Sequence, residues 1–357
     1  MEIFYKRQSI RFKKMIEPKN LLIVRTDRIG DVVLSLPLAE IIKRHFPACR
    51  VTYLLREYTK SLAHKHPFID EILLLKEENG KVIIRDNYQE LKKYDFDSCI
   101  IVYPTFQTTL IAFLSGIKHR IGTGYRWYSF LLNHKIFEHR KYAEKHELEY
   151  NVNLLKAFGI NEKVSVDKIK FHLNVEPQSE KVVDKLLNDN KIERAKPIVI
   201  IHPGSGGSAI DLPTNSFKEL VRMLSLGSKF SIIITGLSSE KELCDELIIN
   251  DNIKNFAGKL SLSEMIALIN KSTIFISNST GPIHIAAALE KLTIGFYPKI
   301  LACSAKRWGP YSNKGKIFVP KIDCKDCTRE QCERLNCMSS IKMDEVFSEV
   351  QKLLNFN

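Results

Sequence analysis

Two arginines and two aspartates stand together where an apolar run gives way to a helical pattern. The stretch "NLLIVRTDRIGDVVLSLPLA" (20–39) places Arg25, Asp27, Arg28 and Asp31 directly after the apolar run. In α/β proteins such a strand-to-helix junction is a common ligand site. A carboxylate here can act as a general base, or it can simply favour the first turn of the helix. The arginines can hold an anionic acceptor or pair with these aspartates.

A glycine- and serine-rich loop, "HPGSGGSAIDLP" (202–213), is a second candidate site. Glycines let backbone N–H groups turn toward one ligand, and serine hydroxyls add donors, so a phosphate can be held without a lysine. The loop is neither a P-loop nor a G-x-G-x-x-G fingerprint, so an ordinary loop is the alternative. Its candidate phosphate ligands are Ser205, Gly206, Gly207 and Ser208.

A third loop, "ISNSTGPIHIAAAL" (276–289), leads from a predicted strand into a predicted helix. Its candidate residues are Ser279, Thr280, Gly281 and His284. The free N–H groups at the start of a helix attract anions, although a capped helix that binds nothing would look the same. Two such loops in one half of the chain favour a diphosphate ligand.

Between these two loops, "TGLSSEKEL" (235–243) follows another predicted strand. Glu240 can accept hydrogen bonds from ribose hydroxyls, as acidic residues in comparable loops do. The alternative is a first-turn glutamate favoured by the helix dipole.

These loops must be positioned by alternating strands and helices. Apolar runs without polar alternation, separated by helical patterns, predict parallel sheets covered on both faces. The predicted strands are 21–24, 51–55, 71–75, 98–103, 197–202, 230–235, 273–277 and 293–297. Helices are expected at 32–46, kinked at Pro37, and at 217–226.

The series starts afresh after a polar stretch near Val175, so we predict two doubly wound α/β domains that face each other across a cleft. The boundaries are 1–174 for the first domain, with 1–17 as a basic extension, and 175–340 for the second. A helix in 341–357 is expected to pack back toward the first domain.

Composition limits the kind of protein. The chain has 357 residues, is 44% hydrophobic and carries a formal charge of +13. No apolar run approaches the roughly 20 residues that span a bilayer, and no signal peptide is visible, so we expect a cytoplasmic protein. The charge predicts an anionic partner, or it reflects only a lysine-rich composition. Nucleic-acid motifs are missing, so we expect no nucleic-acid partner.

The first residues, "MEIFYKRQSIRFKKMI", interleave apolar and basic side chains. They could form an amphipathic helix on an anionic membrane surface or a frayed basic tail. A basic tract, "GIKHRIGTGYRWYSFLLNHKI" (116–136), contains Lys118, Arg120, Arg126 and Lys135. These side chains suit phosphates and acidic sugars, or form a solvated basic face.

The motifs as a set resemble glycosyltransferase family 9, the lipopolysaccharide heptosyltransferases. The similarity lies in "RTDRIGDVVLSLPLAEIIKRHFP", "HPGSGGSAIDLP", "NFAGKLSLSEMIALI", "SNSTGPIHIAAAL" and "RWGPY…CKDC…C…CMSSI", in that order from about residue 18. It implies a GT-B fold, with the acceptor on the first domain and the sugar nucleotide on the second. It also implies an inverting transfer that needs no metal or other cofactor.

The resemblance assigns roles to individual residues. Asp31 matches the proposed general base of the family. The donor-binding positions would be Ser205, Gly206, Gly207, Ser208, Glu240, Leu260, Ser279, Thr280, Gly281 and His284. The acceptor, a lipopolysaccharide or lipid A core at the inner membrane face, would meet Arg25, Arg28, Arg120 and Arg126.

Two departures weaken the identification of the donor as ADP-heptose. Ile210 stands where the family usually has a basic residue, and Leu212 replaces a tryptophan. Ser279 replaces an aspartate of the "D-T-G" pattern. Another nucleotide sugar, or a non-catalytic binder of sugar nucleotides or glycolipids, is therefore the alternative. An epimerase on the same plan would need further acid and base residues, which the sequence does not offer.

Four cysteines cluster late in the chain as "CKDCTREQCERLNC". Their spacing would allow Cys324, Cys327, Cys332 and Cys337 to surround a structural zinc ion. The resemblance argues against this, because similar segments in the family have no recognised metal. No catalytic metal is expected.

Overall fold

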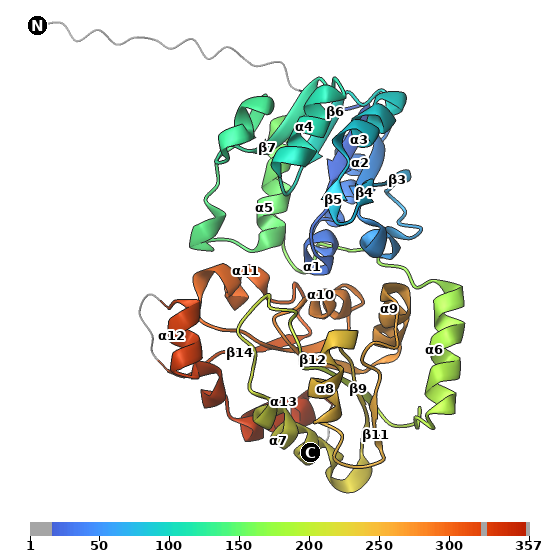
Figure 1. Cartoon of the computed structure of the whole chain (residues 1–357), viewed down its shortest axis with the longest axis vertical. Coiled ribbons are helices and arrows are strands. Elements are labelled where there is room, and N and C mark those ends of the chain that lie inside the picture. The colour runs from blue at the N-terminus through green and yellow to red at the C-terminus, as the bar shows by residue number, and fades with distance from the viewer. Residues whose placement is uncertain (1–15, 323–326, 355–357) are drawn as a thin grey trace, which may run out of the picture.

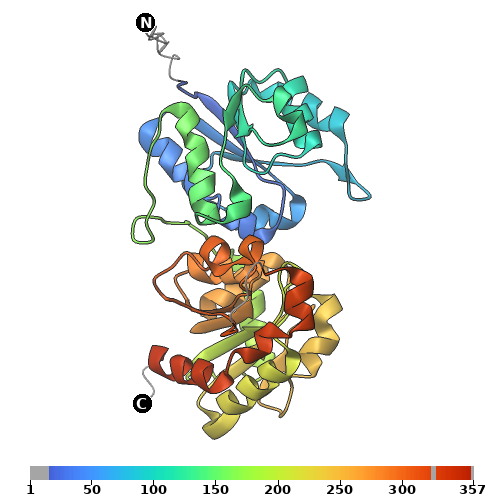
Figure 2. The same cartoon turned by 90° about the vertical axis from the view of Figure 1, so that its left-hand side faces the viewer.

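A computed structural model describes residues 16–322 and 327–354. Two six-stranded sheets, one in each half of the chain, lie one above the other in Figures 1 and 2. The N-terminal segment, for which we predict a membrane helix or a basic tail, lies outside the described residues.

The two sheets have the same topology. The first has the order β3-β2-β1-β6-β7-β8 and the second β11-β10-β9-β12-β13-β14. Every neighbouring pair is parallel. The strands of the first sheet are β1 (Asn20–Val24), β2 (Arg50–Leu55), β3 (Glu71–Leu74), β6 (Ser98–Ile101), β7 (His119–Thr123) and β8 (His134–Ile136). Those of the second are β9 (Ile198–His202), β10 (Ser231–Ile234), β11 (Ile253–Asn255), β12 (Ile274–Asn278), β13 (Leu292–Phe296) and β14 (Gly315–Phe318).

The central strands are the ones that the sequence predicts best. In β9 all five residues are buried, and in β1 four of five, because helices cover both faces of each sheet. The predicted doubly wound α/β class is confirmed. A small antiparallel hairpin, β4 (Glu77–Glu78) with β5 (Lys81–Val82), stands outside both sheets.

Helices connect the strands in both halves. The first half contains α1 (Ile29–Val33), α2 (Pro37–His45), α3 (Ile84–Leu91), α4 (Phe106–Leu114) and α5 (Glu147–Asn153). The second contains α6 (Pro177–Asp189), α7 (Thr214–Ser225), α8 (Lys241–Asp245), α9 (Leu262–Lys271), α10 (Gly281–Ala288), α11 (Ala305–Trp308), α12 (Arg329–Arg334) and α13 (Met343–Leu353).

Pro37 divides the first predicted helix into two. Helix α1 ends at Val33, a tight turn follows, and α2 begins at Pro37 itself. Proline has no N–H to donate, and its ring clashes with the preceding turn of a helix, so it starts a helix more readily than it continues one. This break keeps α1 very short.

The C-terminal helix corrects a prediction. Helix α13 packs against α7 in the second half and not toward the first domain. Its apolar stripe, Met343, Val346 and Val350, is buried in the same core as Phe217 and Leu220. A helical stripe in the sequence shows that a helix has a partner but does not say which surface provides it.

Four strands of the two six-stranded sheets are not predicted from the sequence. Strands β7, β8, β11 and β14 lie toward the sheet edges, and β8 reads only "HKI". Edge strands carry polar and basic residues because one side of them meets solvent, so the apolar-run signal is lost. Among the described residues, no helix is long and apolar enough to cross a bilayer.

Candidate active site between the two halves

A cavity of about 490 Å³ lies between the two halves. This volume is within the range of small-molecule sites. The first half lines it with Arg28, Ile29, Gly30, Asp31 and Tyr58. The second half adds His202, Ser205, Gly206, Ser208, Leu237, Glu240, Ser279, Thr280, Gly281, Pro282, His284, Ala302, Cys303 and Trp308.

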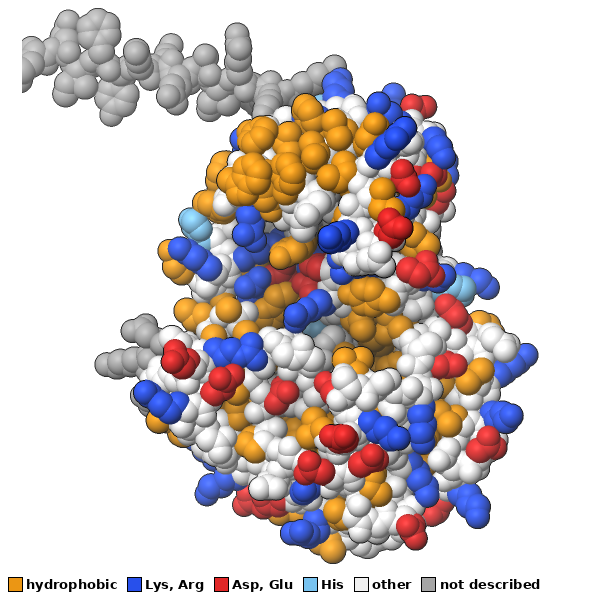
Figure 3. Space-filling model, in the orientation of Figure 1, with side chains coloured by type: hydrophobic (Ala, Val, Ile, Leu, Met, Phe, Trp, Pro, Cys, Tyr) orange, Lys and Arg blue, Asp and Glu red, His pale blue; other side chains and the backbone are white. Residues whose placement is uncertain are grey.

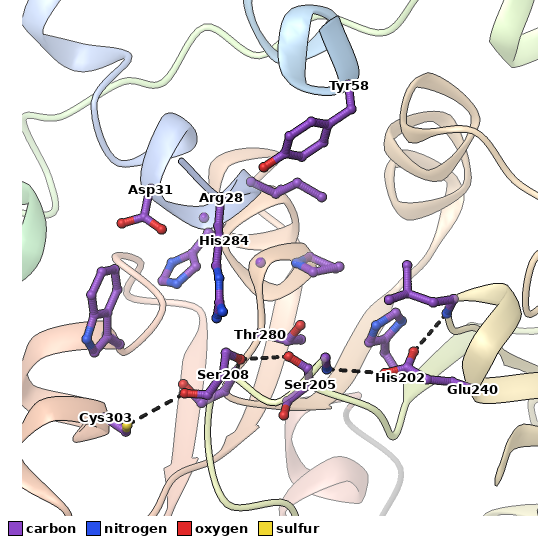
Figure 4. Close-up of a pocket in the computed structure, with 18 of the residues that line it drawn as sticks. Arg28, Asp31, Tyr58, His202, Ser205, Ser208, Glu240, Thr280, His284 and Cys303 are labelled. Carbon is purple, nitrogen blue, oxygen red and sulfur yellow. Dashed lines mark hydrogen bonds between the residues drawn. The ribbon is translucent and has the colours of Figure 1, made fainter. Parts of the chain in front are cut away.

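Asp31 faces this cavity from the first turn of α1, as Figure 4 shows. Its carboxylate accepts a hydrogen bond from Arg25, with 2.5 Å between Oδ1 and Nη2. The Asp31 side chain is 17% exposed and that of Arg25 is 0% exposed. One carboxylate oxygen is therefore fixed by a buried cation, while the residue still lines the space where a ligand would bind.

Arg25 corrects a second prediction, because a fully buried side chain is not available to an acceptor. Its Nε lies 2.7 Å from Asp27, and its Nη1 donates to Asn151 at 3.3 Å. Burial acts to lower the pKa of Arg25, but Asp27 and Asp31 outweigh it, so the pKa is raised and the cation is retained. Arg25 therefore holds the Asp31 side chain in position from the protein interior.

Asp27 differs from Asp31 in its surroundings. Burial raises the pKa of Asp27 to about 7, and the nearby Asp31 carboxylate adds to the rise, while Arg25 opposes it. Asp27 is not among the residues that line the cavity. A general base must first reach the proton it removes, so geometry favours Asp31.

A further group of buried charges, which no sequence pattern predicts, joins the two halves. Glu147, at the start of α5, is 1% exposed. It pairs with Arg140 in its own half and accepts from Arg307 Nε of α11 at 3.0 Å. Arg140 also donates to Asn151 at 3.4 Å. Glu147 and Arg307 are far apart in sequence, so no local motif connects them.

Helices α1 and α10 meet through two glycines. A Cβ atom at Gly30 would lie 2.6 Å from His284 Cδ2, and one at Gly281 would lie 2.9 Å from Ile29 Cβ. Only residues without side chains allow this approach. Burial lowers the pKa of His284 to about 3, with a smaller contribution from His146, so the ring is neutral at pH 7.

The loop after β9 is shaped by positive φ angles and by Glu240. Gly206 and Gly207 have φ values of +55° and +74°. The carboxylate of Glu240 accepts from Gly206 N–H at 3.2 Å and from Leu237 N–H at 2.8 Å. Glu240 thus anchors the loop. Each carboxylate oxygen can accept a further hydrogen bond, and Glu240 lines the cavity where a ligand could donate it.

The two glycine-containing loops of the second half are tied together. Ser208 Oγ lies 2.9 Å from the carbonyl oxygen of Ser279 and 2.8 Å from that of Ser205, either of which can accept its hydrogen. Cys303 Sγ is 3.6 Å from the Ser208 carbonyl oxygen. The loops after β9 and β12 therefore form one wall, drawn in the lower part of Figure 4.

Arg28 reaches this wall from the opposite half. It is the residue that precedes α1, and its side chain points toward Ser208 and Thr280 in Figure 4. It is exposed, and within the described part of the chain it forms no ion pair shorter than 4 Å. Arg28 thus presents a cation to two loops, 202–213 and 276–282, whose own sequences contain no Lys or Arg, and Ile210 of the first loop packs against the core of the second half.

The other predicted residues lie elsewhere. Gly207 and Leu260 are not among the lining residues, and Leu260 packs on the core. Arg120 Nε donates to the Leu131 carbonyl at 2.7 Å, and the guanidinium lies 5.2 Å from the centre of the Phe113 ring. Neither Arg120 nor Arg126 lines this cavity. Both lie on the surface formed by the 116–136 tract.

Several lining residues were missed by sequence reasoning. His202 ends β9 and is bonded to Thr235 Oγ1 at 3.0 Å, and burial lowers its pKa to about 4. Trp308 belongs to the "RWGPY" motif, so the sequence did offer a reason to consider this residue. Tyr58, whose hydroxyl donates to the Asp27 carbonyl, had no such signal.

The cysteine cluster can be described only in part, because Cys324 lies outside the described residues. Cys327 Sγ and Cys332 Sγ are 3.3 Å apart. Burial, together with the neighbouring thiols, raises the pKa of Cys332 to about 12. In the described ranges no group of three or more His, Cys, Asp or Glu could hold a metal ion. The zinc hypothesis, which needs Cys324, stays a prediction.

Comparison with known proteins gives the family. Residues 84–338 match the profile described as glycosyltransferase family 9 (heptosyltransferase). A Haemophilus influenzae protein whose name says glycosyltransferase and specifies no sugar is 29% identical over 309 residues, covering 85% of this chain and 89% of that protein. Lipooligosaccharide heptosyltransferase 2 of the same organism is 24% identical over 314 residues, covering 84% and 88%.

A solved structure supports the fold. The ADP-heptose lipopolysaccharide heptosyltransferase II of Escherichia coli is similar with a TM-score of 0.76 and 19% identity, covering 94% of this chain and 98% of that one. The predicted GT-B architecture and the predicted family are both confirmed.

Proposed function

This chain belongs to glycosyltransferase family 9, and we propose that it is an inverting transferase with Asp31 as its general base. It would move a heptose or related sugar from a nucleotide donor to a lipopolysaccharide core or similar glycolipid. The observation that carries the proposal is the position of Asp31: it is held by a buried arginine and lines a cavity whose opposite wall is built from two glycine-containing loops.

The chemistry requires little more than this arrangement. The acceptor hydroxyl gives its proton to the Asp31 carboxylate while its oxygen attacks the anomeric carbon. The bond from that carbon to the diphosphate breaks on the opposite side, and the diphosphate leaves with the electron pair, so the configuration inverts. Arg25 orients Asp31 through its hydrogen bond to the carboxylate. Asp31 therefore takes the proton, and Arg25 holds the Asp31 side chain in place.

The departing diphosphate needs positive charge or N–H donors. The backbone at Gly206 and Gly281 and the hydroxyls of Ser205 and Thr280 line the cavity where it would lie. We propose that Arg28 supplies the cation that Ile210 does not. This moves Arg28 from the acceptor to the donor. No metal ion has a part in this scheme.

The donor base and ribose would lie near Glu240 and His202. Relatives named as heptosyltransferases favour ADP-heptose. Ser279 is still a departure from the family pattern, so another nucleotide sugar is the alternative. The domain assignment stays a proposal too: residues 1–174 for the acceptor, 175–340 for the donor.

We place the enzyme at the inner face of the cytoplasmic membrane. The acceptors that the relatives' names specify, lipooligosaccharide and lipopolysaccharide, are lipid-anchored. The net charge of +13 suits an anionic lipid surface.

Asp31→Asn tests the catalytic role. The amide keeps the shape of the side chain but cannot take the proton, so turnover should fall about 10²- to 10⁴-fold, the usual contribution of a general base. ADP affinity, measured by calorimetry, should be unchanged. Asp27→Asn is the matched control and should retain most turnover. If Asp31→Asn transferred sugar at the wild-type rate, Asp31 would not be the base.

The turnover assay on the wild-type chain separates a transferase from a non-catalytic binder. A binder would take up nucleotide sugars but release no nucleotide diphosphate when lipid-linked acceptor is added to the wild-type chain. Comparing ADP-heptose with UDP and GDP sugars in a thermal-shift screen identifies the donor, because a ligand of the native state raises the melting temperature.

A further inference from the structure

Helix α4 is apolar on the side that faces solvent. Phe106, Leu110, Phe113 and Leu114 stand at helical spacings of four, three and one residues, which places them on one stripe. The opposite stripe, with Ile111 and Ala112, is the buried one. A surface helix normally presents polar side chains to water, so the outer stripe needs an explanation.

A short 3₁₀ helix, η3 (Trp127–Leu131), extends this surface. Trp127 stacks on Phe106 with 5.2 Å between ring centres. Trp127 is 74% exposed and Phe130 67% exposed. We call Phe106, Phe113, Leu114, Trp127 and Phe130 the aromatic patch. Figure 3 shows hydrophobic side chains gathered over this part of the N-terminal half, where α4 lies in Figure 1.

The aromatic patch is bordered by positive charge. From Phe106 to Phe137 the sequence has four Lys or Arg and no Asp or Glu. Arg120 is fixed at the edge of the patch, over the Phe113 ring. Lys118, Arg126 and Lys135 are exposed. On the neighbouring α3, Glu90 pairs with Lys76 and Lys93 at 3.0 and 2.9 Å, which compensates its charge.

We propose that the aromatic patch and its basic border dock the enzyme on an anionic phospholipid bilayer. Protruding aromatic side chains enter the headgroup region of a bilayer, and arginine and lysine beside them meet the lipid phosphates. The Arg120 and Arg126 side chains, which sequence similarity assigned to the acceptor, then contact lipid phosphates. This inference deepens the proposed function, from which it takes only that the acceptor is lipid-anchored.

The charge of this surface argues against a second copy of the chain as the occupant. Pairing two identical patches would bring the same lysines and arginines together, which like-charge repulsion opposes. The orientation also favours a bilayer. In Figure 3 the hydrophobic side chains gathered where α4 lies in Figure 1 stand above the hollow between the two halves and on the same face of the molecule. A docked enzyme would therefore keep its cleft open beside the membrane.

The test is vesicle co-sedimentation of the full-length chain with vesicles containing phosphatidylglycerol and with vesicles of phosphatidylcholine alone. We expect binding to the anionic vesicles and about tenfold or greater weakening in the double variant Trp127→Ser/Phe130→Ser, which removes two aromatic side chains. The matched control, Leu226→Ser/Ile249→Ser, removes exposed apolar side chains from the other half and should bind as the wild type does.

Charge is tested separately. Lys118→Gln/Lys135→Gln should weaken anionic vesicle binding roughly 5-fold or more for each lysine. Trp127 also reports directly: the chain has two tryptophans, so in a Trp308→Phe background its emission should shift to the blue when anionic vesicles are added.

Four results would overturn the proposal. These are unchanged vesicle binding by Trp127→Ser/Phe130→Ser, equal loss in the Leu226→Ser/Ile249→Ser control, equal binding to both vesicle types, or a solution dimer that only the aromatic variant dissociates. ADP affinity is measured on the Trp127, Phe130, Lys118 and Lys135 variants, because none of these residues lines the cavity. It reports on the proposed nucleotide site independently, so failure of membrane docking and failure of the transferase assignment would be distinguished.

Discussion

Gly30→Ala gives the sharpest test of how the two halves position Asp31, the proposed general base. The added Cβ would lie 2.6 Å from His284 Cδ2, whereas ordinary contacts begin at 3.4 Å. The two atoms must therefore separate by the difference of 0.8 Å. His284 is buried, and its ring centre is 6.5 Å from that of Trp308, so the ring has little room to turn away. Most of the displacement must come from a shift of α1 against α10.

The magnitude follows from two opposing effects. Overpacking of this kind costs about 1–3 kcal/mol. Replacing glycine by alanine within a helix returns up to about 1 kcal/mol. The net change in unfolding free energy is then small, but Asp31, one residue further along α1, moves relative to the wall formed by the loops after β9 and β12. A displacement approaching 1 Å at a reacting group lowers the rate about 10²-fold.

The assay compares turnover with thermal stability. We expect Gly30→Ala to lose about two orders of magnitude in kcat, with a melting temperature within a few degrees of wild type. The double variant Gly30→Ala/His284→Ala removes the atoms that collide, so it should be no less active than His284→Ala alone. Wild-type turnover in Gly30→Ala would refute the close-contact argument, and a further loss in the double variant would show that the clash is not the cause.

Two further predictions concern Asp27 and Gly204. Because burial raises the pKa of Asp27 to about 7, the native state holds a proton that the unfolded state has released above about pH 4. The unfolding free energy should therefore fall as pH rises from 4 to 7, by about 1 kcal/mol per unit more than in Asp27→Asn. Parallel urea-denaturation curves for the two proteins would contradict this. A Cβ at Gly204 would lie 2.0 Å from Glu240 Oε1, so Gly204→Ala should release the loop and weaken ADP binding about tenfold. Calorimetry that gave an unchanged Kd would mean that Glu240 does not shape the site.

The sequence predicts the central framework because its signals are local. Strands β1 and β9 are continuous apolar runs, and Pro37 interrupts a helix wherever it occurs. Within each sheet the parallel strands present their carboxyl ends at one edge, and loops from the edges of both sheets line one cavity. The lining role of Asp31 and Ser205 could thus be anticipated without coordinates.

The sequence does not predict how deeply a side chain is buried or which residues far apart in the chain contact each other. Arg25 and Arg28 are three residues apart and chemically identical, yet one is fully buried and the other is exposed in the cavity. Arg25 directly follows the buried strand β1, and Arg28 directly precedes helix α1. Local spacing does not encode this difference. The same limit applies to Arg120, which reads as a ligand-binding cation but has its guanidinium engaged by backbone carbonyls.

The buried charges show why the position of Asp31, the proposed base, depends on both halves. Arg25 holds Asp31 in the first half, and Glu147, whose charge also acts on Arg25, is bound by Arg307 of the second half. Separating the halves would take Arg307 from Glu147 and leave Arg140 as its partner in the first half, so the buried carboxylate would lose part of its charge compensation. Gly30 adds a contact with His284 that no other residue type would allow. The orientation of Asp31 is therefore set by Arg25 within the first half and by the fit of α1 against α10 between the halves, so the proposed proton removal depends on a closed cleft.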